Sequence, residues 1–151
     1  MNIRLNKKII KSLKPCADRY ENFLKYYSDF DGQLEEFLDL ENITYQDKIW
    51  LAVRLMPRFL VEVFAIDCAV RASAYATDAY APTNAARYAA AAATYAYTDA
   101  DAYTALYAAD AAHYAAAHYA ADAAAERQNQ IESIIYLIQN NLTHHVTENI
   151  S

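Results

Sequence analysis

The chain has very little glycine and proline. Among its 151 residues Gly32 is the only glycine, and there are three prolines. These residues make most tight turns, so their scarcity leaves little material for loops. Alanine, the strongest helix former, saturates the second half of the chain, where many of the 14 tyrosines also lie. The composition predicts an all-α protein, and the length predicts a single domain that buries a real core.

Basic side chains are also in short supply. Lysine and arginine number 13 against 19 acidic residues, which gives a net charge of -6 and a pI near 5.1. Nucleic-acid binding depends on clustered basic residues, so we expect no nucleic-acid partner. The basic residues gather only in the opening "NIRLNKKIIKSLK", where four lysines interrupt what would be the apolar part of a signal peptide: Lys7, Lys8, Lys11 and Lys14.

Long apolar runs are absent from the sequence, and alanine is a weak substitute for leucine in a membrane. We therefore expect a cytoplasmic protein without a membrane partner. In that compartment Cys16 and Cys68 are predicted to be reduced thiols that behave as small buried hydrophobic residues rather than as a disulfide.

Residues 1–71 have conventional amphipathic patterns. Apolar positions at helical spacing predict helices over residues 16–27 and within "QLEEFLDL". Thr44 with Asp47 three positions later predicts the start of another helix, which Pro57 should end or kink. Two buried stripes are expected, one of Ile49, Ala52, Val53 and Met56, and one of Leu60, Val63, Phe64 and Cys68.

Residues 72–128 are rich in alanine and tyrosine. One straight helix from residue 84 to 139 would be roughly 80 Å long, far more than a compact chain of this size spans. Breaks are predicted at Thr98, with Asp101 as its capping partner, and at Asn129, with Glu132 in the same role. The expected helices cover residues 84–97, 99–127 and 130–140 of a closely packed bundle. Residues 129–140 would close this bundle, and residues 141–151 would form a flexible tail.

A ridge of tyrosine, aspartate and histidine runs along the alanine-rich part at helical spacing: Tyr95, Asp99, Tyr103, Tyr107, Asp110, Tyr114, His118 and Asp122. In one interpretation alanine lets helices approach closely, while the tyrosines are buried and bond to the acids. In the other, part of the ridge is exposed and binds a partner.

Metal binding is the weaker hypothesis for this segment. His118 and Asp122 are four residues apart and Glu126 follows one turn later, a spacing that can place ligands on one metal. The chain lacks a glycine-rich phosphate loop, a nucleophile elbow and a Cys-x-x-Cys motif. No catalytic residue and no cofactor is therefore expected, and the protein is predicted not to be an enzyme.

From "FAIDCAVRASAY" onward the sequence resembles a family of small alanine-rich immunity proteins of bacteria and their phages. The likeness lies in Asp67, Cys68, Ala69 and Arg71, in "PTNAAR" at residues 82–87, and in "AAAERQNQIESIIYL". It covers roughly residues 60–138. The resemblance implies a non-enzymatic protector that binds and neutralises a cognate toxin.

The sequence therefore predicts an acidic inhibitor, an immunity or anti-defence protein, whose charge steers it toward a basic toxin or defence protein. The predicted contact residues are Tyr103, Tyr107, Tyr114, Tyr119, Asp99, Asp101 and Asp110. One alternative is a binder of a small, nucleotide-like ligand or of a metal, in a pocket between the alanine-rich helices. Another is a homo-oligomer that assembles through its alanine face.

Overall fold

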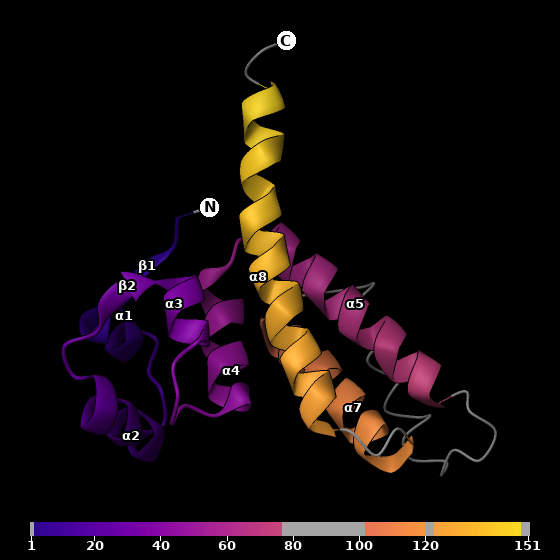
Figure 1. Cartoon of the computed structure of the whole chain (residues 1–151), viewed down its shortest axis with the longest axis horizontal. Coiled ribbons are helices and arrows are strands. Elements are labelled where there is room, and N and C mark those ends of the chain that lie inside the picture. The colour runs from indigo at the N-terminus through magenta and orange to yellow at the C-terminus, as the bar shows by residue number, and fades with distance from the viewer. Residues whose placement is uncertain (1, 77–101, 120–122, 149–151) are drawn as a thin grey trace.

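The computed structural model describes residues 2–76, 102–119 and 123–148, and the helix expected at residues 84–97 and the cap at Thr98 lie outside this part (Figure 1). The described chain is mostly helical. Its elements in order are β1 (Arg4–Asn6), α1 (Lys7–Ser12), α2 (Ala17–Tyr27), β2 (Asp31–Gln33), α3 (Leu34–Leu38), α4 (Tyr45–Leu55), α5 (Arg58–Ala76), α7 (Ala102–Tyr119) and α8 (Ala123–Glu148).

Several helices begin where side chains satisfy the first free backbone N–H groups. The Asn6 side chain accepts hydrogen bonds from the backbone of Lys8 and Ile9 at the start of α1. Thr44 Oγ1 accepts from the Asp47 backbone at 3.1 Å, which confirms the predicted start of α4. That helix ends at Leu55, before Pro57, as expected.

A small antiparallel sheet corrects the all-α prediction. β1 pairs with β2 in the register Arg4 to Gln33, Leu5 to Gly32 and Asn6 to Asp31. The strands are too short to show an alternating pattern, and their pairing joins segments far apart in sequence. Opposite the fully buried Leu5, Gly32 leaves room for the Glu36 side chain, which accepts from the Gln33 backbone at 2.8 Å and caps α3.

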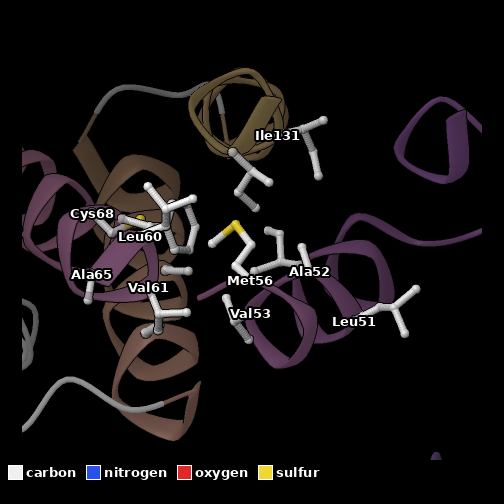
Figure 2. Packing of buried hydrophobic residues seen from close by; sticks show 14 of the residues in the cluster. Leu51, Ala52, Val53, Met56, Leu60, Val61, Ala65, Cys68 and Ile131 are labelled. Atoms are coloured by element: carbon white, nitrogen blue, oxygen red, sulfur yellow. The ribbon is translucent and has the colours of Figure 1, made fainter. Parts of the chain in front are cut away.

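The core joins α4 to the long helices. Figure 2 shows Met56 among side chains of α4, α5 and α8, with Ala52, Leu60 and Ile131 around it. The predicted α4 stripe is confirmed, because Ile49, Ala52, Val53 and Met56 are all buried. In the α5 stripe Leu60, Phe64 and Cys68 are buried, but Val63 is 47% exposed and turns away from the core.

Helices α5 and α7 form the most extensive contact between any two described elements. Alanine makes up most of the buried face of α7 and the second part of the buried face of α5, and its small side chain lets helix backbones lie close together. These alanines are Ala65, Ala69, Ala72, Ala105, Ala108, Ala109 and Ala112. We call this contact the alanine seam. Side-chain bonds between α8 and each of these helices show that both run antiparallel to α8, so α5 and α7 run parallel to each other.

Helix α8 corrects three predictions about the second half of the chain. The single helix expected over residues 99–127 is wrong, because α7 ends at Tyr119 and α8 begins at Ala123. Helix α8 is continuous from Ala123 to Glu148, so Asn129 and Glu132 lie inside a helix and do not begin one. Residues 141–148, expected to be a flexible tail, belong to this helix. At 1.5 Å per residue its 26 residues span about 39 Å, and its C-terminal turns extend beyond the other elements (Figure 1).

Candidate functional site

Helix α7 has an alanine face and a tyrosine face, and the structure shows which of them packs. Its alanines at positions 105, 108, 109, 112, 115 and 116 are all at most 1% exposed. Tyr103, by contrast, is 77% exposed and Tyr114 is 39% exposed. The helix is thus turned with its smallest side chains inward. The interpretation in which the tyrosines are buried is therefore wrong for these two residues.

The remaining predicted contact residues divide into three groups. Asp110 is exposed on the same side of α7 as Tyr103 and Tyr114, whereas Tyr107 is half-buried and packs against the core. Tyr119 is the last residue of α7, and its side chain lies outside the described part. Asp99 and Asp101 also fall outside it. We call Tyr103, Asp110 and Tyr114 the outer face of α7.

The candidate metal ligands are not brought together in the described part of the chain. Glu126 is buried and its carboxylate is bonded to Arg71 and Gln130. The side chain of His118 and all of Asp122 lie outside the described residues. Among residues that are described, no group of three or more His, Cys, Asp or Glu side chains has the geometry of a metal site.

A network of charged and polar groups lies behind the outer face, where α5 meets α8. Arg71 Nε donates to Glu126 Oε1 at 3.0 Å, and its Nη1 is bonded to Asp67 on the same helix. Ser133 of α8 donates to the same Asp67 oxygen at 2.9 Å. The Glu126 side chain has no exposed surface and Arg71 retains 22% of its own, so this ion pair is largely withdrawn from water.

The same network continues to α7. Gln130 is fully buried and donates through Nε2 to Glu126 Oε1 and to the backbone oxygen of Ala109, both at 2.9 Å. Arg127 donates to Gln130 at 2.9 Å and to Asp110 at 2.6 Å. Asp110 therefore connects the outer face to the interior, and its position is fixed from α8.

The Cys68 thiol lies beside this network, with its sulfur 3.6 Å from Arg71 Nη2. Burial raises the pKa of the Cys68 thiol far above its ordinary value, although the Arg71 charge acts in the opposite direction. Burial alone would lower the pKa of the Arg71 guanidinium, but the carboxylates of Glu126 and Asp67 outweigh it and raise that pKa. Cys68 is thus a neutral thiol and Arg71 a permanent cation, a combination suited to structure rather than to nucleophilic attack.

Cys16 departs from the prediction of a buried thiol, because it is exposed at the start of α2. Cys68 is buried as expected. Position in the chain explains the difference, because Cys16 precedes the first turn of its helix and Cys68 lies on the core side of α5.

Sequence reasoning missed the buried network and an apolar strip on α5. Phe59, Val63 and Val70 are 46%, 47% and 55% exposed and lie on the side of α5 that faces away from the core. Their spacing at four and seven residues could have indicated a second face. For the network, only the pair of Asp67 with Arg71 was visible, because Glu126 and Gln130 meet it from a helix far along the chain.

The chain matches no protein-family model, no curated protein and no solved structure. The resemblance to immunity proteins therefore stays a prediction. No helix in the described residues is both long and apolar enough to cross a membrane.

Proposed function

We propose that the chain is a non-enzymatic binding protein, an immunity or anti-defence inhibitor that neutralises a partner protein through the outer face of α7. The observation that carries the proposal is the orientation of that helix, which packs on alanine and leaves Tyr103 and Tyr114 exposed. Tyrosine supplies a large contact area at little cost in rotamer entropy and is enriched among the residues that dominate binding energy.

The outer face is held rigid from behind, which favours binding. Asp110 is bonded to Arg127, whose side chain is only 10% exposed, and Arg127 is bonded to the fully buried Gln130. A face that keeps one arrangement before and after binding loses little conformational freedom when a partner arrives. The polar network thus supports recognition from the interior and reaches the partner-binding surface only through Asp110.

Charge favours a basic partner. Residues 1–57 carry nine basic and nine acidic side chains, whereas residues 58–151 carry four basic and ten acidic ones. The whole net charge of -6 therefore belongs to the part of the chain that includes α5, α7 and α8. Such a field attracts a basic toxin or defence protein and raises the association rate, an effect that salt should weaken.

The first experiment places the photo-cross-linking residue p-benzoylphenylalanine at Tyr103 and, as a matched control, at Tyr136. Tyr136 is 65% exposed on α8, against 77% for Tyr103, and so is comparably accessible. In cells that carry the gene, light should join a single protein to the chain at position 103 and not at position 136. Equal products from both positions, or none from position 103, would contradict the proposal.

The second experiment uses the partner found in this way. Replacing Tyr103 and Tyr114 together by alanine should weaken binding about 30-fold, since a dominant contact is worth roughly 2 kcal/mol. Tyr136→Ala should leave the affinity unchanged. The partner's own activity, measured with one equivalent of the chain, should be abolished. If the partner binds but keeps its activity, the chain is not an inhibitor, although the proposed binding face still holds.

A further inference from the structure

A cavity of about 210 Å³ lies in the N-terminal part of the molecule, far along the chain from the outer face of α7. Its floor is formed by buried side chains of α1, α2, α3 and α4: Ile10, Phe23, Phe37 and Leu51, each at most 5% exposed. Its rim includes the exposed residues Cys16, Arg19 and Gln46. The cavity thus has an apolar interior and polar residues at its edge, the usual form of a small-ligand site.

Four of the twelve lining residues are aromatic. Tyr20, Phe23, Phe37 and Trp50 all contribute, and the rings of Phe23 and Phe37 lie 6.1 Å apart between centroids. Tyr20 stacks on Phe23 at 6.3 Å. An engineered apolar cavity of roughly 150 Å³ holds benzene, so this one has room for a somewhat larger flat ring system. Aromatic walls favour an aromatic guest through offset and edge-to-face contacts.

Two exposed lysines adjoin lining residues of the cavity in sequence. Arg19 is already paired with Asp47 at 3.0 Å, and Asp18 lies 4.0 Å from it, so its charge is balanced. Lys11 and Lys14, however, directly neighbour the lining residues Ile10 and Pro15 in sequence, and both are exposed. Within the described residues neither lysine makes an ion pair.

We propose that this cavity binds a small planar aromatic molecule that carries an anionic group. The ring lies against Phe23, Phe37 and Trp50, and the anionic group faces the lysines that follow Ile10 and precede Pro15. This site is distinct from the small-ligand pocket expected between the alanine-rich helices, and it does not depend on the proposed function.

Trp50 makes the proposal directly testable, because it is the only tryptophan in the chain and lines the cavity. The probe is 8-anilinonaphthalene-1-sulfonate, an aromatic anion that quenches tryptophan when bound nearby. Titration should quench Trp50 saturably with one probe per chain. The uncharged analogue N-phenyl-1-naphthylamine should bind at least fivefold more weakly. Unsaturable quenching, or equal binding of the two compounds, would overturn the proposal.

The charge at the rim is tested with paired lysine variants. Lys11→Gln should weaken binding of the anionic probe about threefold and leave binding of the neutral one unchanged. Lys25→Gln is the matched control, because Lys25 is an exposed lysine on α2 whose sequence neighbours Leu24 and Tyr26 do not line the cavity. An equal effect of the two variants would contradict the predicted position of the anionic group.

The location is tested through Cys16. It is the exposed thiol, and Cys68 is fully buried, so N-ethylmaleimide should modify the folded protein only at the cavity rim. Modification should reduce probe affinity at least tenfold, while Cys16→Ser, treated in the same way, keeps its affinity. Unchanged binding by the modified protein would place the probe elsewhere.

The oligomeric state is tested by sedimentation under the same conditions, which should show a monomer. A dimer that excludes the probe would mean that a second copy of the chain occupies the cavity, and would overturn the proposal.

Discussion

The two halves of this molecule bury their helices in different ways. Residues 1–57 pack large side chains such as Phe23, Leu34, Phe37 and Ile49, whereas α5 and α7 meet through the alanine seam. A large side chain contributes stability through the apolar area that it removes from water. Alanine removes little area for each residue, so the seam depends on close approach of two backbones along their length.

The difference also concerns register. Moving α7 by three residues would replace Ala105, Ala108, Ala109 and Ala112 at the seam by alanines 108, 111, 112 and 115. Alanine contacts alone therefore discriminate poorly between neighbouring registers, whereas phenylalanines of irregular shape discriminate well. The network around Arg71 and Glu126 supplies what the seam lacks, because its bonds form in only one arrangement of α5, α7 and α8.

The largest expected effect comes from removing a ring in the first half. Phe37→Ala should lower the free energy of unfolding by about 4 kcal/mol, because it deletes a buried ring and leaves a void among Phe23 and Phe30. Phe59→Ala, at a ring that is 46% exposed, should cost less than about 1 kcal/mol. Urea unfolding of both variants measures this contrast, and equal losses would show that the first half is not held by its aromatic core.

Breaking the network comes next. Arg71→Met should lower the free energy of unfolding by about 3 kcal/mol, because Glu126 remains buried without its cation. Arg58→Met is the control, because Arg58 on the same helix is also paired with a glutamate, Glu62, but this pair is exposed. The control should cost less than about 1 kcal/mol.

A double variant separates charge from packing at this site. Arg71→Met combined with Glu126→Gln should recover part of the loss, because the buried negative charge is then gone. If the double variant is no more stable than Arg71→Met alone, the network acts through shape and not through charge compensation.

The alanine seam is tested by enlarging one side chain. Ala112→Leu should cost about 2 kcal/mol, since the buried alanine has no space for three more carbon atoms and the helices must separate. Ala117→Leu is the control, because Ala117 is exposed on the same helix. Thermal unfolding of the two variants measures the difference. A stable Ala112→Leu would mean that α5 and α7 are less closely packed than their buried alanines indicate.

The first half was largely predictable because its signals are local. Thr44 with Asp47 marks a helix start by a bond between residues three apart, and Pro57 marks an end by its own ring. The two strands were not predictable, since three residues pair with three others across a long separation. The helix start predicted at Asn129 was wrong because a cap and its partner are three residues apart, which is also about one turn inside a continuous helix.

The candidate site was predictable only in part. Periodicity shows that Tyr103, Asp110 and Tyr114 share a face, but it cannot show which face of α7 packs. Alanine is often fully buried and tyrosine is intermediate, so residue type alone leaves both orientations of α7 open, and the structure shows alanine inside. The network escaped prediction because Glu126 and Arg71 are 55 residues apart and meet only after α8 has packed on α5.

The smallest effect is expected at the exposed ion pair of Arg4 with Asp31 in the first half, in contrast to the buried pair of Arg71 with Glu126 in the second. The hydrogen bond and the charge of Arg4 lower the pKa of Asp31, so the pair stabilises the folded state above the ordinary aspartate pKa of about 4 and ceases to do so as pH falls through the lowered value. Asp31→Asn should therefore be slightly less stable than the parent protein at pH 7, and the difference should vanish at low pH. Because both side chains are exposed, about 1 M salt should also abolish it. Urea unfolding at pH 7 and in strong acid measures both effects. A difference that persists in acid would mean that Asp31 acts through the strand pairing itself, and the first half would then share with the second a polar group that fixes register.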